Sequence, residues 1–321
     1  MFNKRIDFNK AFKPFLIGFA AFMVVGILCS IIFGVNLSID FKGGTRIAYS
    51  YSGEIKLSEV DKLVEKTIDR PVNVTESSGL TENSKKLVIT LAGNDALSNE
   101  LQEKLDDTLT KEYKENKLAF SESNSVAGSV AGGFFARAMA AVILTGVLVL
   151  LYVGIRFRKI GGVSAALTAF AALFIDIFVA FFTAVIFRLQ IDMTFLAVIL
   201  TILGYSLNDT IVVYDRIREN KGIYPNYTTA ELVNESLNTV KVRTIVTTVT
   251  TFLAVVMIII VAEIFGLSSL RPFAIPMAFG LISGCLSSLF ISAPLWVMWK
   301  NNMDKKAAAK NRTNSKKAKR V

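Results

Sequence analysis

Residues 193–214 read MTFLAVILTILGYSLNDTIVVY, and this stretch decides the fold class. It is long enough to cross a hydrocarbon core of about 30 Å as a helix. Its only charged residue is Asp209, five residues from its end. An ionisable side chain inside a membrane span is costly and usually faces the interior of a helix bundle. The stretch therefore predicts a membrane helix that carries a buried carboxylate.

Five further apolar runs of similar length surround this one, and the chain as a whole is 52% hydrophobic and 19% charged. A soluble protein would have about a quarter of charged residues. The first run is longer than the apolar core of about 7–15 residues of a cleavable signal peptide, so we expect an uncleaved anchor. The sequence therefore predicts a multi-pass α-helical membrane protein with six transmembrane helices. The other five runs are residues 15–35, 138–155, 161–187, 244–262 and 272–299.

The composition excludes several classes of enzyme. The chain has no histidine, which excludes HExxH zinc sites and nucleophiles activated by histidine. Its two cysteines, Cys29 and Cys285, both lie in apolar runs and indicate neither a disulfide framework nor a metal site. We expect a protein that is not an enzyme.

The distribution of lysine and arginine predicts the orientation. Basic residues gather before the first run, in the loops after the second and fourth runs, and in the tail 300–321. Under the positive-inside rule, both termini are cytoplasmic and residues 36–137 are outside. The net charge of +10 is then a topology signal and predicts no nucleic-acid partner. The basic tail would suit anionic lipid or RNA surfaces, or it is a solvated disordered stretch.

Residues 36–137 have the composition of a soluble domain. Alternating and helical patterns follow one another in the order βαββαβ, which predicts a ferredoxin-like α+β domain. We expect Ser58 to cap its first helix, and Leu97, Leu101, Leu105 and Leu109 to form the apolar stripe of its second. The predicted division of the chain is 1–14 (cytoplasmic), 15–35 (first span), 36–137 (extracytoplasmic domain), 138–299 (five-helix region) and 300–321 (cytoplasmic tail).

Two glycine-bearing stretches flank this domain at the membrane boundary. Gly43 and Gly44 precede its first strand, and Gly128 and Gly132 follow its last. An ordinary strand-entry turn explains the first pair, and close helix packing explains the second. Their position makes a hinge the alternative interpretation.

The fourth and fifth runs predict a polar seam inside the bundle. Asp209 follows Thr201, Tyr205 and Asn208 at helical spacing, and Arg243 opens the fifth run. Pairing between Asp209 and Arg243 is plausible because both lie near the cytoplasmic ends of neighbouring helices. The alternatives are an ion pair that only fixes helix register, or an arginine that extends to the surface. Polar residues continue the fifth-run stripe at Thr247, Thr250 and Thr251.

Asp176 lies near the middle of the third apolar run. No partner for it is evident on its own helix. It is either protonated and silent or part of the same relay as Asp209.

Three motifs resemble one known family. Residues 204–220, GYSLNDTIVVYDRIREN, resemble the fourth-span signature of the SecD–SecF family of bacterial protein-export membrane proteins, which is related to the resistance–nodulation–division transporters. SLNT at 236–239 followed by RTI at 243–245 resembles the entry of its fifth span, and IDF at 39–41 with GGT at 43–45 resembles the motif after its first span. Ser38 stands where glycine is usual, and Ile175 stands before Asp176 where histidine is usual.

The resemblance implies an accessory subunit in the bacterial cell membrane that couples the proton-motive force to late protein export. It implies Asp209 as the proton-carrying carboxylate and Arg243 as its essential partner, with Asp176, Thr201, Tyr205, Asn208 and Thr247 supporting them. The implied coupling ion is a proton or a sodium ion, with no other cofactor. The implied partners are a SecD-like subunit, a SecYEG-type channel, exported unfolded polypeptides and membrane lipid.

Two rival functions remain open. A small-molecule or lipid exporter of the same superfamily would usually carry two copies of the six-span unit, whereas one copy is found here. An intramembrane aspartyl protease could use Asp176 and Asp209 as a dyad. Such a protease would show a GxGD-type turn, but Ser-Leu-Asn precedes Asp209.

Overall fold

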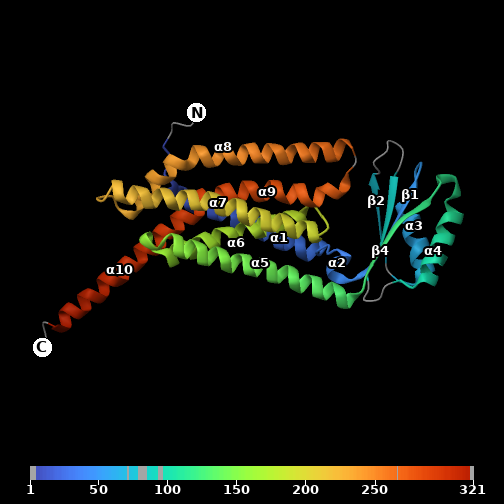
Figure 1. The fold of residues 1–321 in the computed structure, drawn as a ribbon, viewed down its shortest axis with the longest axis horizontal. Helices are drawn as coiled ribbons and strands as arrows, with labels where there is room; N and C mark the ends of the chain where they lie inside the picture. Colours follow the sequence, from blue (N-terminus) through green and yellow to red (C-terminus); the bar gives the residue numbers. More distant parts are fainter. Residues whose placement is uncertain (1–4, 71, 79–84, 93–96, 266, 319–321) are drawn as a thin grey trace.

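A computed structural model of the protein describes residues 5–70, 72–78, 85–92, 97–265 and 267–318. It shows a long helix bundle with a small domain of strands and helices at one end (Figure 1). Within the described residues, six helices are long and apolar enough to cross a membrane, which confirms the predicted number of spans. Five are α1 (Phe8–Phe33), α5 (Gly128–Arg156), α6 (Gly162–Ile186), α7 (Met193–Ile223) and α8 (Thr229–Ile264), and the sixth joins α9 (Arg271–Ser287), the π-helical η4 (Ser288–Ser292) and α10 (Ala293–Ala318).

Several of these helices extend beyond the apolar runs that predict them. α7 continues to Ile223, and α8 begins at Thr229 rather than near residue 244. The start of α8 has a capping box, in which Thr228 and Glu231 satisfy each other's backbone N–H groups. Hydrophobicity marks only the part of a helix that lies in hydrocarbon, so polar helical extensions leave no signal in it.

The small domain has the element order βαββαβ that the sequence predicts. Its four strands form one antiparallel sheet in the order β2-β3-β1-β4. Residues of β1, β3, α3 and α4 form its core, including Tyr49, Val64 and Leu105. The elements of the domain are β1 (Gly44–Tyr51), α3 (Leu57–Ile68), β2 (Val72–Ser78), β3 (Lys85–Ala92), α4 (Asn99–Glu112), the short η1 (Lys114–Asn116) and β4 (Ala119–Val126). The short helix α2 (Ile39–Lys42) precedes β1, and the turns η2 (Arg158–Ile160) and η3 (Ser268–Leu270) lie between the membrane helices.

The two helices of this domain begin differently from expectation. The N-cap of α3 is Lys56, which makes no side-chain cap, so the prediction that Ser58 caps this helix is wrong. The helix is held instead by its buried face, and Ser58 lies inside its first turn. α4 begins after Ser98, whose side chain accepts a hydrogen bond from the Leu101 N–H. Of the expected leucine stripe, Leu97 lies before the helix, and residues 93–96 lie outside the described residues.

The segment between α1 and the sheet is hydrogen-bonded to the loop between α6 and α7. The Ser38 N–H donates to the Ile191 carbonyl at 2.9 Å, and the Ile191 N–H donates to the Asn36 carbonyl at 2.8 Å. Gly44 has φ +135°, and a Cβ there would overlap the Leu91 carbonyl oxygen. The chain therefore enters the sheet through a fixed and crowded turn.

The other predicted hinge residues lie close by. Gly43 ends the short helix α2 with φ +77°, Gly128 is the first residue of α5, and Gly132 lies within α5. Phe41 of α2 makes an edge contact with Phe135 of α5, at 5.8 Å between ring centroids. Hinge motion at these glycines stays a prediction.

The centre of the bundle is formed by α6, α7 and α9, whereas α1, α5 and α8 are mostly exposed. α9 approaches α7 closely through two glycines. A Cβ on Gly280 would overlap Ile202, and one on Gly284 would lie 3.0 Å from the Ser206 Cβ. Small residues four apart allow such backbone contact between membrane helices.

Candidate functional site

Asp176 of α6 is the most enclosed charged group in the described bundle, with no exposed surface. Three serine hydroxyls donate to its carboxylate. Ser206 of α7 and Ser287 of α9 donate to Oδ2 at 2.6 and 2.9 Å, and Ser283 of α9 donates to Oδ1 at 2.5 Å. The carboxylate therefore joins three helices through hydrogen bonds, and among the described residues no group of opposite charge bonds to it.

Asp209 of α7 lies one turn further along the same helix as Ser206. Its side chain is 3% exposed, but Oδ2 has no hydrogen-bond partner among the described residues. Two buried hydroxyls of α8, on Thr244 and Thr248, also lack partners there. The helices α7 and α8 thus carry buried polar groups without partners among the described residues, which folded proteins usually avoid.

Asp176 and Asp209 lie near each other around α9, and they make no direct contact. Cys285 of α9 is buried and lies within the electrostatic influence of both Asp176 and Asp209. The two oxygens of Asp176 bind serines, and among the described residues no hydrogen bond joins it to Asp209. In aspartic proteases the two catalytic carboxyl groups share a proton, whereas Asp176 accepts from three serines here.

Arg243 stands at the edge of the site. It is exposed, yet its charge acts on Asp209. Among the residues that the structure describes, no hydrogen bond or ion pair joins the two side chains. The structure therefore brings Arg243 close enough for its charge to act on Asp209, while Arg243 itself stays exposed.

The remaining predicted seam residues divide between the inside and the outside of the bundle. The Tyr205 hydroxyl donates to Thr251 at 3.3 Å and so links α7 to α8. Thr201, Asn208 and Thr247 are exposed. Each step of one residue along a helix turns the direction of the side chain by about 100°. A polar stripe that is predicted one residue too early in the sequence therefore faces outward. The buried polar stripes are instead Ser206, Asp209 and Thr210 on α7 and Thr244 and Thr248 on α8.

A second row of hydroxyls follows α7 away from Asp209. Thr210 bonds Ser288 at 3.0 Å. The Tyr214 hydroxyl bonds Thr168 at 2.8 Å and Ser292 at 3.1 Å. Ser288 and Ser292 begin and end the π-helical η4, and such π segments often occur at functional positions. The sequence reasoning missed all of these serines, although the Gly280, Gly284, Ser288 spacing was a signal for close packing.

Among the described residues, the polar groups around the two carboxylates are hydroxyl oxygens and the thiol of Cys285. Within the described ranges, no group of three or more histidine, cysteine or acidic side chains could hold a metal ion. Carboxylate and hydroxyl oxygens suit protons or hard cations rather than transition metals.

Six membrane helices with a carboxylate on each of two central helices, and a soluble domain after the first span, define the class: a multi-pass membrane protein with an intramembrane acidic site. The family described as protein export membrane protein SecD/SecF, C-terminal, matches residues 106–302. The SecD/SecF GG motif matches residues 30–53. The chain belongs to the SecD/SecF family, as the sequence motifs predict.

Individual relatives agree with this assignment. Over 306 residues the chain is 35% identical to protein translocase subunit SecDF of Bacillus subtilis, covering 94% of this chain and 39% of that protein. It is 32% identical to protein translocase subunit SecF of Alicyclobacillus acidocaldarius, covering 94% of this chain and 96% of that protein. The crystal structure of SecDF, a translocon-associated membrane protein from Thermus thermophilus, superposes with a TM-score of 0.78 at 28% identity, over 94% of this chain and 39% of that one.

Proposed function

We propose that this chain is an accessory subunit of the bacterial Sec protein-export machinery that couples an ion gradient to late translocation. Asp209 takes up and releases the coupling ion, a proton or a sodium ion. The names of its relatives, protein translocase subunits SecF and SecDF, support the export role. Exported unfolded polypeptides and a SecYEG-type channel are the partners that this role requires.

The observation that carries the proposal is the unpartnered oxygen of Asp209. A buried carboxylate without donors costs free energy that a proton or cation would remove. Asp176 is the contrasting case, because three hydroxyl donors already satisfy its carboxylate. Moving one charge across 100 mV supplies about 2.3 kcal/mol. That energy shifts a two-state equilibrium roughly fiftyfold, enough to bias the orientation of the small domain.

A SecD-like partner subunit follows from the outward polar groups of α7 and α8. Arg243 and Asn208 are exposed at the level of the membrane spans. Facing lipid, a charged guanidinium group and an amide would lack partners. The SecDF relatives are more than twice as long as this chain, which covers 39% of them. A second six-span subunit would supply partners for these exposed polar groups.

The same proposal fixes the placement of the chain in the bacterial cell membrane. Both termini are cytoplasmic, and the small domain is an extracytoplasmic ferredoxin-like unit, for which the strand order β2-β3-β1-β4 is the support. Cysteines introduced at Ser52 and Asn226, in a background without Cys29 and Cys285, should react with an impermeant thiol reagent from opposite sides. Reaction from one side only would contradict the topology.

The deciding experiment is Asp209→Asn, measured together with its partner complex. The amide has nearly the same shape but cannot ionise, so we expect normal complex yield and at least a tenfold loss of gradient-dependent export. Asp107→Asn is the matched control, because it makes the same chemical change at an exposed residue of α4. Normal export by a well-assembled Asp209→Asn protein would remove the proposed role of Asp209.

A further inference from the structure

The last helix leaves the bundle at the end opposite the small domain. In Figure 1, α10 diverges from the other membrane helices and runs on beyond them to the C-terminus. Its first residues still pack inside the bundle, where Trp296 and Val297 are buried. From residue 298 to residue 306 the side chains are exposed or half-buried. The helix thus changes within one turn from a core element to one that is open to its surroundings.

One face of this open part of α10 is apolar and then basic. The exposed fraction is 47% for Met298, 41% for Trp299 and 56% for Met303. These residues recur at the spacing of one helical face and line a shallow hollow. All the described residues that line it belong to α10, and they are Leu295, Met298, Trp299, Asn302, Met303 and Lys306. No other part of the described structure therefore covers this face.

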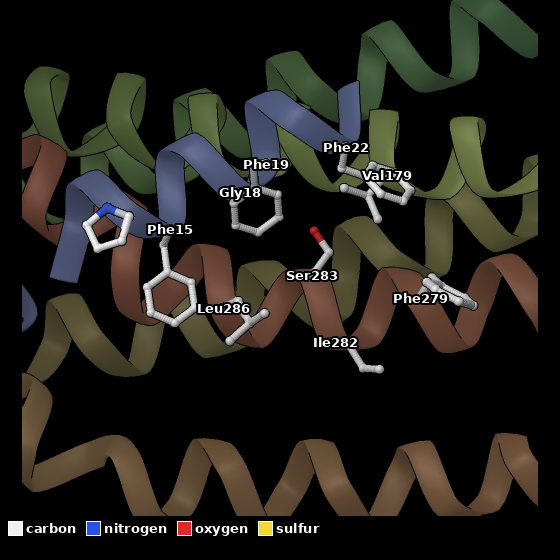
Figure 2. A pocket seen from close by; sticks show the side chains of 10 residues that line it. Phe15, Gly18, Phe19, Phe22, Val179, Phe279, Ile282, Ser283 and Leu286 are labelled. Atoms are coloured by element: carbon white, nitrogen blue, oxygen red, sulfur yellow. The ribbon is translucent and has the colours of Figure 1, made fainter. Parts of the chain in front are cut away.

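A second exposed hollow, between α1 and α9, shows how little an apolar surface indicates by itself. Figure 2 shows it lined by side chains such as Phe15, Phe19 and Leu286, and none of its described lining residues is charged. Lipid hydrocarbon and a partner helix would both fit such a surface. The face of α10 is more informative, because lysines follow its apolar residues.

The depth of Trp299 in the membrane follows from its neighbours. The Trp296 indole N–H donates to the Ser164 hydroxyl at 3.0 Å, and Ser164 lies in the first turn of α6, just after the basic turn η2. The path from Arg271, at the other end of this span, to Trp299 is about 42 Å at about 1.5 Å per residue. A bilayer with its headgroups is about 40–45 Å thick. Trp299 therefore lies at the level of the headgroups.

The residues that follow Trp299 are strongly basic. Residues 300–321 contain nine lysines and arginines and one acidic residue, Asp304. Within the described part of the chain, Lys305 and Lys306 are exposed and belong to no ion pair. A partner polypeptide would need acidic groups at this level to bind them. An anionic membrane surface has phosphates there already, with hydrocarbon one or two turns deeper.

We propose that this face of α10 binds anionic phospholipid. Met298 contacts the acyl chains, and Trp299 lies at the boundary between chains and headgroups. Lys305 and Lys306 bind the phosphates of the headgroups. The order apolar, aromatic, basic along the helix is the order hydrocarbon, interface, headgroup across one leaflet of a membrane. Lipid binding at α10 goes beyond the export role and does not depend on it.

The chain has two tryptophans, which makes a fluorescence test specific. Trp296→Phe leaves Trp299 as the single indole, whereas Trp299→Phe leaves Trp296, which is 2% exposed. The full chain is reconstituted into vesicles of equal parts phosphatidylglycerol and phosphatidylcholine at low salt. One set of vesicles carries bromine on the acyl chains of phosphatidylglycerol, and the other carries it on those of phosphatidylcholine. The two sets therefore have the same surface charge.

Bromine quenches indole fluorescence on contact, so a difference between the two sets shows which lipid lies against Trp299. We expect brominated phosphatidylglycerol to quench Trp299 about twofold more strongly than brominated phosphatidylcholine, and the difference to disappear in about 0.5 M salt. Lys305→Gln together with Lys306→Gln should at least halve the difference. Lys62→Gln together with Lys66→Gln is the matched control, because it removes two exposed lysines from α3 and should leave the difference unchanged.

Equal quenching of Trp299 by the two lipids would overturn the preference for anionic lipid. Quenching by neither lipid would overturn lipid binding itself, and protection of Trp299 from aqueous iodide would then assign this face to a protein interface. An unchanged difference after both lysine substitutions would overturn the role of Lys305 and Lys306. If Trp296→Phe does not yield a monodisperse protein, subtracting the signal of Trp299→Phe from that of the wild type isolates Trp299 and carries the same expectations.

Discussion

Two buried carboxylates on neighbouring helices differ in the hydrogen bonds that they accept. Asp176 accepts three serine hydroxyls from two other helices. Asp209, one turn from one of those serines, has an oxygen that finds no donor among the described residues. Burial alone therefore does not separate the two carboxylates. The unsatisfied hydrogen-bonding capacity of Asp209 does separate them, and the proposed role of Asp209 rests on that difference.

The difference has a physical consequence for each residue. A buried polar network that is fully satisfied makes a structure rigid and specific. A buried group left unsatisfied costs about 1–3 kcal/mol and more when it is charged. Asp176 should thus contribute to the stability of the bundle, while Asp209 should reduce stability and supply function.

The largest expected effect on stability comes from replacing each carboxylate by leucine. Asp176→Leu leaves three buried serine hydroxyls without their acceptor. The variant should lose about 2–5 kcal/mol of unfolding free energy once some of these hydroxyls have found other acceptors. Ser287 already has a second acceptor, the Gly284 carbonyl at 3.2 Å, so its hydroxyl does not stay without a partner. Asp209→Leu removes an unpaired buried charge and should change stability little or raise it. Thermal unfolding of both variants in the same detergent shows which of the two proteins is less stable.

If Asp209→Leu is the less stable protein, the proposed difference between the two carboxylates is wrong. It would mean that Asp209 has a structural partner in the assembled state of this chain. Retention of wild-type stability by Asp176→Leu would equally show that the three serines satisfy each other through helix carbonyls.

Local patterns were sufficient to predict the six membrane helices and the βαββαβ domain. Continuous apolar runs and alternation depend only on neighbouring residues, so they can be detected without knowing how helices pack. The prediction of Asp209 as a buried group relied on the same logic, since a charge in a span must face inward. Its location on the inner face of α7 agrees with that reasoning.

The serines around Asp176 could not be predicted in this way. A serine in a membrane helix can bond the carbonyl of its own preceding turn, so its presence indicates no partner. Which hydroxyls reach Asp176 depends on the rotation of α6, α7 and α9 about their axes. A small error in rotation also explains why Thr247 was expected inside the seam, whereas Thr244 and Thr248 are the buried threonines.

A smaller effect tests whether the approach of α7 to α9 holds the Asp176 cluster together. Gly284 of α9 faces Ser206, and an added Cβ would lie 3.0 Å from the Ser206 Cβ. Neither atom can move without its helix, because both are attached directly to the backbone. Gly284→Ala should therefore push the two helices apart and lengthen the bond from Ser206 to Asp176, although Ser283 and Ser287 keep theirs.

The magnitude follows from two opposing contributions. Overpacking of a well-filled interior typically costs about 1–3 kcal/mol, while alanine in place of glycine favours a helix by up to about 1 kcal/mol. Gly18→Ala is the control for the second contribution, because a Cβ there meets nothing within 4 Å. Because both variants gain the same helix contribution, we expect Gly284→Ala to be less stable than Gly18→Ala by the overpacking cost of about 1–3 kcal/mol in thermal unfolding. Equal stability of the two variants would show that α7 and α9 separate freely, and that Ser206 contributes little to holding Asp176.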